Sequence, residues 1–434
     1  MSLYVKEIRG VVNSEITNEF ASNMGTMIGN FLKPGKNVVV GRDTSLFSQM
    51  IKRSITAGLM ASGIGVIDFG VAPIPTVHYG ASLYDTDVII TITASHLRPD
   101  EIAIKIFSDY KIPMAQKHAE RVPWDKIGYL SYVYDYVDRY LNAVLENVEK
   151  EIIRSMGLKV VVDCANASTV PFMPQLLNIL GCETILFGCQ TTETSSKMFA
   201  EPTPETLSMV SDLVKSIGAD LGMALDNDGD RIIFIDENGN IIRDQTVLGI
   251  FARESLIKNP GGTIVSSVVA SRALDETVLK YEGNLIKAPV NLVLNKTIEN
   301  KAVFGGDEPG MYIFPEFQDC FDAIFTGVKM IETICKQNKT LSQLAGEIPE
   351  YPRTGFSIEC EHENKEDVLN NLKENLDEKG VSITTDGIRI DWEDAYILVR
   401  PSRFEPLMRV YIESKTSKKL DELSNELKNM IQDV

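Results

Sequence analysis

The sequence predicts an α/β protein built from several domains. Short apolar runs alternate with longer amphipathic stretches along most of the chain, which is the pattern of α/β architecture. The chain has 434 residues, enough for several domains that each bury a core. Apolar residues make up 44% and charged residues 24% of the chain, a composition typical of a soluble globular protein.

The first predicted domain covers residues 1–140. Residues 38–40 (Val-Val-Val) are expected to form a strand, and residues 48–61 a helix. Residues 88–92 are a continuous apolar run, which indicates a fully buried strand. Ser95 should therefore lie just past the carboxyl end of a strand, the edge at which open α/β sheets bind ligands.

The second predicted domain covers residues 141–238. Residues 159–163 are expected to form a strand, and residues 171–180 a helix closed by a glycine. Two further strands are expected around residues 221–224 and 232–236. A short acidic sequence lies in the tight loop between these two strands.

The third and fourth predicted domains cover residues 239–350 and 351–434. The third ends with a helix expected at residues 322–337. Tyr351 followed by a proline indicates a linker. The fourth domain is smaller and mixes strands with a helix expected at residues 365–378, so an α+β unit is predicted there.

Charge and cysteine content exclude several classes of function. The net charge of −18 argues against nucleic acid as a partner, because such binding depends on neutralising phosphates. No apolar stretch is long enough to cross a membrane and the N-terminus has no apolar signal segment, so we expect no membrane association and a cytoplasmic location. The six scattered cysteines form no CxxC pair, which argues against a zinc site or a disulfide framework. Homo-oligomerisation is left open.

The acidic loop carries three carboxylates on alternate positions, Asp226, Asp228 and Asp230. Such triplets commonly hold a hard divalent metal ion. A calcium loop of the EF-hand type is one alternative, with Glu237 at its twelfth position, but its sixth position is Arg231 where that loop requires glycine. A solvated acidic turn is the other alternative.

Four further motifs accompany the acidic triplet. Thr-Ala-Ser-His occupies residues 93–96, and Lys-Glu-Ile-Arg-Gly residues 6–10. Gly-Gly-Asp-Glu-Pro-Gly occupies residues 305–310, and Arg-Pro-Ser-Arg-Phe-Glu-Pro residues 400–406. With these five motifs in this order, the chain resembles the α-D-phosphohexomutase family, which includes phosphoglucomutase, phosphomannomutase and phosphoglucosamine mutase.

The resemblance implies a fold and an activity. The fold would be three similar mixed-sheet α/β domains followed by a smaller α+β C-terminal domain. The activity would be the interconversion of hexose 1-phosphate and hexose 6-phosphate, with glucose, mannose or glucosamine as the hexose. It would proceed through a phosphoserine and a bound hexose 1,6-bisphosphate, which acts as intermediate and activator.

The resemblance also assigns the residues of phosphoryl transfer. Ser95 would carry the phosphoryl group, and Asp226, Asp228 and Asp230 would bind Mg²⁺ together with an oxygen of the Ser95 phosphate. Lys105 would contribute acid/base chemistry and charge stabilisation. His96 would donate a hydrogen bond to phosphate, and the remaining active-site cations would be Arg9 and Arg231.

Substrate recognition is assigned to the two later loops. Asp307 and Glu308 would accept hydrogen bonds from sugar hydroxyls. The phosphate that is not being transferred would be clamped by the C-terminal loop, since arginine offers planar, multidentate donors. The residues of this clamp would be Arg400, Ser402, Arg403 and Arg409.

The chain departs from the family pattern mainly in the sugar loop. The usual Gly-Glu-x-Ser-Gly-His reads Gly-Asp-Glu-Pro-Gly-Met at residues 306–311, so a serine hydroxyl and an imidazole are absent. We therefore expect loose sugar choice, with glucose and mannose phosphates accepted within a factor of roughly ten to a hundred. The extra carboxylate at Glu308 could favour the ammonium group of an amino sugar.

Two alternative functions follow from the same residues. A catalytically weak relative could bind phosphosugars as a sensor or regulatory partner, which the altered sugar loop motivates. A Mg²⁺-dependent sugar phosphatase would use water as the acceptor in place of the sugar hydroxyl.

Overall fold

The computed structural model describes residues 4–94, 98–113, 120–191, 202–361, 363–376, 381–383, 386–402 and 405–432. Ser95, His96 and Arg403 therefore lie outside the described residues. The chain divides into two compact units, and each unit is assembled from two segments. The first unit comprises Met1–Arg243 and Gly310–Leu344, and the second Asp244–Pro309 and Ala345–Val434. Among the described residues no helix combines the length and apolarity needed to cross a membrane.

A six-stranded mixed sheet opens the first unit, in the order β1-β5-β4-β2-β3-β6. Strands β4, β2, β3 and β6 run parallel, and β5 joins β4 and β1 in antiparallel pairs. The strands are β1 (Tyr4–Val11), β2 (Asn37–Arg42), β3 (Gly65–Val71), β4 (Val88–Thr93), β5 (Glu101–Ser108) and β6 (Leu130–Tyr132).

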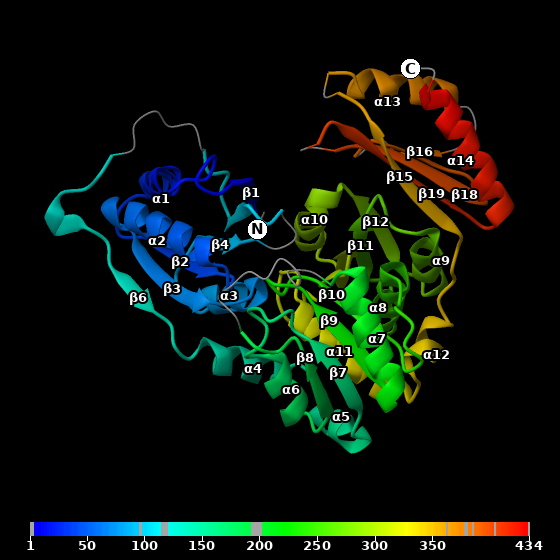
Figure 1. Ribbon diagram of the computed structural model, residues 1–434, viewed down its shortest axis with the longest axis horizontal. Helices are drawn as coiled ribbons and strands as arrows, with labels where there is room; N and C mark the ends of the chain where they lie inside the picture. Colours follow the sequence, from blue (N-terminus) through cyan, green and yellow to red (C-terminus); the bar gives the residue numbers. More distant parts are fainter. Residues whose placement is uncertain are drawn as a thin grey trace. The chain divides into compact units, whose positions relative to one another are not determined.

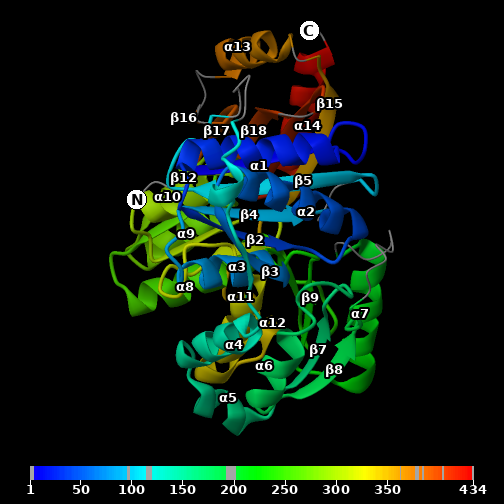
Figure 2. The same ribbon diagram turned by 90° about the vertical axis from the view of Figure 1, so that its left-hand side faces the viewer.

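Helices cover both faces of this sheet. Apolar residues of α1 (Asn18–Leu32) and α2 (Leu46–Ala61) form one core with the sheet, whereas α3 (Ile74–Ala81) belongs to a core on the other face. Helices α1 and α2 lie side by side (Figure 2). A side chain at Gly25 or Gly58 would meet the backbone of the facing helix, so this close approach requires glycine at both positions.

The second sheet of the first unit has the order β10-β9-β7-β8, with β10 antiparallel to three parallel strands. Helix α7 packs on one face, and α11 and α6 contact the sheet as well. The strands are β7 (Lys159–Asp163), β8 (Glu183–Phe187), β9 (Leu221–Leu225) and β10 (Ile232–Ile235). The helices are α4 (Tyr136–Glu146), α5 (Lys150–Met156), α6 (Met173–Ile179), α7 (Pro204–Ile217) and α11 (Ala323–Gln337). Two short elements are η1 (Trp124–Lys126) and β14 (Met311–Ile313).

The second unit contains parallel strands in the order β12-β11-β13. The strands are β11 (Thr263–Ser267), β12 (Asn284–Ala288) and β13 (Phe304–Asp307). The accompanying helices are α8 (Asp244–Lys258), α9 (Arg272–Lys280), η2 (Val290–Leu292) and α10 (Val293–Glu299). The short helix α12 (Leu341–Ala345) spans the point where the chain passes between units.

The C-terminal part of the second unit is an antiparallel sheet in the order β15-β19-β18-β17-β16. Two helices, α13 and α14, lie along it (Figure 1), and their apolar residues share one core with the strands. The strands are β15 (Arg353–Glu359), β16 (Val381–Ile383), β17 (Ile388–Asp391), β18 (Ala395–Pro401) and β19 (Leu407–Ser414). The helices are α13 (Lys365–Leu376) and α14 (Ser417–Gln432). The predicted fold class, α/β domains followed by a smaller α+β domain, is confirmed.

Candidate active site

The acidic triplet lies in the turn of a β-hairpin between β9 and β10. Two hydrogen bonds of 3.2 Å close the turn: the amide of Asp226 donates to the carbonyl of Arg231, and the amide of Arg231 donates to the side-chain Oδ1 of Asp226. Gly229 adopts φ 72° within it, and a Cβ there would approach Pro73 to 2.8 Å. The hairpin thus places three carboxylates from alternate positions in one small buried turn.

The geometry of the triplet fits a hard divalent cation. One carboxylate oxygen from each of Asp226, Asp228 and Asp230 lies within 4.8 Å of the others, and all three residues are buried. Within the described part of the chain, Asp226 Oδ2 and Asp230 Oδ1 are buried and accept no hydrogen bond. Buried carboxylate oxygens without donors are costly, and oxygen ligands are those that Mg²⁺ prefers. These three residues can therefore hold Mg²⁺.

The electrostatics of the turn shift the pKa values of Asp226 and Asp228 in opposite directions. Burial, reinforced by the negative charges of Asp228 and Asp230, raises the pKa of Asp226 well above its ordinary value. Burial also acts on Asp228, but the ammonium group of Lys105 outweighs it and lowers the pKa of that carboxyl. The turn concentrates negative charge that a cation would relieve.

Lys105 is the cation that contacts the triplet. It lies on β5, and its Nζ donates to Asp228 Oδ2 at 3.0 Å and to Asp230 Oδ2 at 2.9 Å. Burial alone would lower the pKa of Lys105, but attraction by the two aspartates raises it above its ordinary value. Lys105 therefore lies against two aspartates of the triplet, and its predicted part in acid/base chemistry and charge stabilisation stays a prediction.

Asp43 links the segment before Ser95 to the acidic turn. Its Oδ2 accepts from the amide of Ala94 at 2.7 Å and from Asn227 Nδ2 at 3.1 Å. Its Oδ1 accepts from the hydroxyl of Ser45 at 2.6 Å. Although Ser95 itself is outside the described residues, the residue before it is thus held beside the metal turn.

Two other predicted cations are engaged within the first unit. Arg9 lies on β1 and forms a two-point contact with Glu7, at 2.8 and 3.0 Å. Arg231 Nε lies 3.8 Å from Asp230 Oδ1. Arg231 therefore lies next to the triplet, while the Arg9 side chain is directed to its neighbour on the same strand.

The sugar loop begins at the end of β13 in the second unit. Asp307 is 1% exposed; its Oδ1 accepts from the amide of Glu308 at 2.9 Å, whereas its Oδ2 is buried and accepts no hydrogen bond from any described residue. Burial raises the pKa of Asp307 to about 7. Both oxygens of Glu308 lie 2.9 Å from Nη1 of Arg353. Of the two residues predicted to contact the sugar, Glu308 is thus paired with an arginine and Asp307 is not.

The phosphate loop follows β18. Arg400 Nη2 donates to Asp386 Oδ2 at 2.9 Å, and its Nε is buried without a hydrogen-bond partner among the described residues. Arg409 on β19 is the register partner of Arg400, and its Nη2 donates to Glu405 Oε2 at 2.7 Å. Two like charges opposite each other repel, so an anion between them would be stabilised.

Lys365 holds the backbone of this loop in place. Its Nζ donates to the carbonyls of Ser402 and Glu405, each at 2.7 Å, and the residue is 6% exposed. The Ser402 hydroxyl also contacts Glu405 Oε2 at 3.3 Å. Ser402 and Glu405 are therefore held by a lysine from α13 that the sequence motif does not contain.

Several site residues were missed by sequence reasoning. The signal for Asp43 was its place after β2, which runs parallel to β4 and so ends at the same sheet edge as that strand. For the others no local signal exists, because their partners are distant in sequence. These residues are Asn227, Arg353, Lys365 and Asp386.

Comparison with known proteins accounts for all four parts of the fold. The chain matches the phosphoglucomutase/phosphomannomutase alpha/beta/alpha domains I, II and III over residues 2–123, 138–239 and 243–351, and the C-terminal domain of that family over residues 358–430. It is 32% identical to a phosphoglucomutase/phosphomannomutase of Thermococcus kodakarensis, over 96% of this chain and 95% of the relative. It is 35% identical to a probable phosphoglucosamine mutase of Methanobrevibacter smithii, over 95% and 94%.

Solved structures show the same similarity. A phosphoglucomutase/phosphomannomutase family protein from Burkholderia thailandensis superposes with a TM-score of 0.88 at 25% identity, covering 98% of this chain and 96% of that one. An Aspergillus fumigatus N-acetylphosphoglucosamine mutase, solved with GlcNAc-6P and magnesium, shares the fold with a TM-score of 0.58 at 15% identity, covering 92% and 77%.

Fold and relatives together define the class of protein: the chain is a phosphohexomutase, an intramolecular phosphotransferase. Within that class, it belongs to the phosphoglucomutase/phosphomannomutase family.

Proposed function

We propose that this enzyme interconverts hexose 1-phosphate and hexose 6-phosphate through a phosphorylated Ser95, Mg²⁺ and a bound hexose 1,6-bisphosphate. The observation that carries the proposal is the buried turn of Asp226, Asp228 and Asp230, with two carboxylate oxygens left without donors and Lys105 beside it. Phosphoryl transfer depends mainly on such positioning and electrostatics. The names of the relatives support the phosphosugar substrate class.

The proposed reaction consists of two transfers that balance each other. In the first, the bond between phosphorus and Ser95 Oγ breaks as a sugar hydroxyl oxygen bonds to phosphorus, and the proton lost by that hydroxyl ends on Ser95 Oγ. In the second, the phosphoryl group at the other sugar position returns to Ser95 Oγ, and the sugar regains a hydroxyl. When bound, Mg²⁺ supplies Lewis-acid stabilisation of the phosphoryl oxygens.

The roles of the chain's own residues follow from this scheme. Asp226, Asp228 and Asp230 hold the metal, and Lys105 adds positive charge beside the phosphoryl group. His96, Arg9 and Arg231 are proposed to bind the phosphoryl oxygens.

The substrate side is assigned to the second unit. Arg400, Ser402, Arg403 and Arg409 are proposed to bind the phosphate that stays in place. Asp307 and Glu308 are proposed to contact the sugar. A cytoplasmic location and the absence of nucleic-acid partners stay predictions.

One assay tests the function against its alternatives. The protein is incubated with Mg²⁺, a trace of glucose 1,6-bisphosphate and each hexose 1-phosphate, and both hexose 6-phosphate and free phosphate are followed. We expect hexose 6-phosphate without net phosphate release. Release of free phosphate would instead identify a phosphatase, and binding without turnover a sensor.

A second experiment tests Ser95. Intact-mass measurement should show one phosphate adduct on the wild type and none on Ser95→Ala, and that variant should lose nearly all turnover. Ser155→Ala, an exposed serine on α5, is the matched control and should keep both the adduct and the activity. Full turnover in Ser95→Ala would contradict the assignment.

A further inference from the structure

Glu308 of the sugar loop is held by an arginine from another part of the second unit. Nη1 of Arg353 lies 2.9 Å from both oxygens of Glu308, and the two side chains are only 12% and 19% exposed. Such a charge-assisted contact in a largely buried place is strong and specific in geometry. The Glu308 carboxylate is therefore both oriented and neutralised.

Arg353 is itself fixed on several sides. It is the first residue of β15, where it pairs in register with Glu413 of β19. Its Nη2 donates to the carbonyl of Val269 at 3.0 Å, and its guanidinium lies 5.4 Å from the centre of the Tyr411 ring. A side chain with this many partners has little freedom to leave Glu308.

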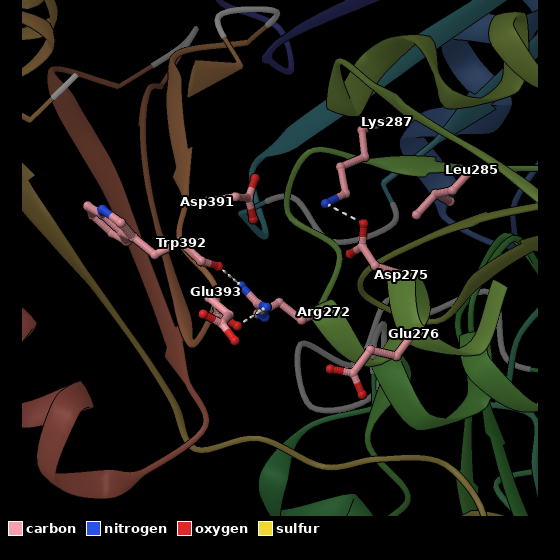
Figure 3. Close-up of a pocket in the computed structure, with 8 residues that line it drawn as sticks. All are labelled: Arg272, Asp275, Glu276, Leu285, Lys287, Asp391, Trp392 and Glu393. Atoms are coloured by element: carbon pink, nitrogen blue, oxygen red, sulfur yellow. Dashed lines mark hydrogen bonds and ion pairs between the residues drawn. The ribbon is translucent and has the colours of Figure 1, made fainter. Parts of the chain in front are cut away.

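Other arginines hold the antiparallel sheet to the β11–β13 layer of the same unit. The fully buried Arg389 donates to the carbonyls of Val268 and Ala270 at 2.6 and 2.8 Å. Figure 3 shows Arg272 pointing at the carbonyls of the turn that contains Trp392 and Glu393. Backbone carbonyls on one side meet guanidinium groups on the other, and Arg353 and Glu308 both lie within this compact unit.

The two acidic residues of the loop consequently present different charges to a ligand. The charge of Glu308 is balanced by Arg353, whereas Asp307 keeps an oxygen, Oδ2, for which the described residues supply no donor. A hydroxyl donor suits such an oxygen. An ammonium group would gain from a second unbalanced carboxylate at position 308, but Arg353 already balances the charge of Glu308.

We propose that Arg353 is a positioning and specificity-determining residue of the sugar site. By holding and neutralising Glu308, it makes the loop favour hexose phosphates with a hydroxyl over those with an ammonium group. The inference rests on the proposed function and refines it, and it replaces the expectation from sequence that Glu308 attracts an amino sugar.

The test compares two substrates in a set of variants. The ratio of kcat/KM for glucosamine 1-phosphate to that for glucose 1-phosphate is measured at a pH at which the amino group is protonated. In Arg353→Met, which keeps bulk and removes charge, the ratio should rise about tenfold because Glu308 becomes unbalanced. In Glu308→Gln the ratio should fall, since the charge of Arg353 then stands alone. The double variant should return toward the wild-type ratio.

Two controls separate positioning from general damage. Arg353→Lys keeps the positive charge but not the planar guanidinium that also reaches the Val269 carbonyl, so it should raise the ratio less than Arg353→Met does. Arg154→Met, an exposed arginine paired with Glu151 on α5, should change nothing. If Arg353→Met does not fold, the opposite shift in Glu308→Gln still decides the matter.

The possible failures are distinguishable. An unchanged ratio in active Arg353→Met and Glu308→Gln overturns the inference and leaves the mutase activity standing. Absence of hexose 6-phosphate formation by the wild type overturns the proposed function. In that case the same ratio is read from the dissociation constants of glucosamine 6-phosphate and glucose 6-phosphate.

Discussion

At the scale of single residues, the acidic turn shows how a fold can prepare a cation site. Folding buries three carboxylates within one turn, and Lys105 balances only part of their charge. Leaving buried charge uncompensated costs free energy. Metal binding would remove that cost, so ion affinity and the stability of the turn should be linked.

Asp228→Asn should therefore weaken metal binding, by at least about tenfold, because one of three ligand charges is lost. Titration calorimetry with Mg²⁺, or with Mn²⁺ as a substitute ion, measures the affinity directly. Asp212→Asn, an exposed aspartate on α7, is the control and should bind like the wild type. If Asp228→Asn bound the ion as tightly as the wild type, the triplet would be an ordinary acidic turn and not a metal site.

Asp307 makes stability depend on pH. Its pKa rises from 3.8 to about 7 on folding, so between these values the folded state binds a proton that the unfolded chain has lost. The free energy of unfolding therefore falls as pH rises through this window. Asp307→Asn removes this pH-dependent loss of stability. Its free energy of unfolding should exceed that of the wild type by up to about 3–4 kcal/mol above pH 7, and the difference should vanish near pH 4.

Urea unfolding of both proteins across this pH range checks the prediction. Asp212→Asn serves again as the control, and its stability should run parallel to that of the wild type. A constant difference between Asp307→Asn and the wild type at every pH would show that Asp307 titrates at its ordinary value when folded.

At the scale of elements, the strand–loop–strand segment from β18 to β19 brings together the cations that we propose bind phosphate. Arg400 and Arg409 are register partners, and each has one carboxylate beside it. Lys365 donates hydrogen bonds to the carbonyls of Ser402 and Glu405. Three cations, Arg400, Arg409 and Lys365, are thus gathered around the ends of β18 and β19.

Arg400→Ala should raise KM for every hexose phosphate by roughly ten- to a hundredfold, because a charged hydrogen bond to phosphate is worth about 1.5–3 kcal/mol. Steady-state kinetics with glucose, mannose and glucosamine phosphates measure this. Arg154→Ala is the matched control. A loss confined to one sugar would assign the loop to sugar recognition.

The elements that carry the motifs were those that the sequence could predict. The apolar run at residues 88–92 became β4, and the helix predicted at residues 322–337 became α11. Lys105 shows the limit, because Ile-Lys-Ile at residues 104–106 has the alternation of an exposed strand. This lysine is buried because β5 lies between β1 and β4 and because its Nζ contacts Asp228 and Asp230.

Contacts between distant segments were beyond prediction for a physical reason. Asp43 and Asn227 are 184 residues apart, and Arg353 lies 45 residues after Glu308. No local propensity encodes such pairs, since they arise when separate elements pack. The sequence motifs predicted which loops matter, while the residues that hold those loops emerged only from the packing.

At the scale of the whole molecule, buried arginines join the two layers of the second unit. Arg389 is fully buried, binds Asp391 at 2.9 and 3.0 Å, and lies over the Tyr396 ring at 3.7 Å. Removing one partner of a buried ion pair leaves the other uncompensated. The joint should therefore be sensitive to a single substitution.

Arg389→Met should lower the free energy of unfolding by about 3–5 kcal/mol. Denaturant unfolding followed by circular dichroism measures the change. Arg154→Met, which alters an exposed arginine, should change it by less than about 0.5 kcal/mol. Similar stability of the two variants would show that apolar contacts around Val268 and Val269 suffice to hold the layers.

The discontinuous build of the second unit bears on how the protein can be cut into fragments. This unit combines residues 244–309 with residues 345–434. A chain terminated after residue 351 would strip the antiparallel sheet from Val268 and Val269, which pack against Tyr396 and Leu398. The truncated protein would carry a freshly exposed apolar patch and should aggregate. Fragments for crystallisation or calorimetry must therefore keep residues 244–434 on one polypeptide, even though residues 310–344 within that span belong to the other unit.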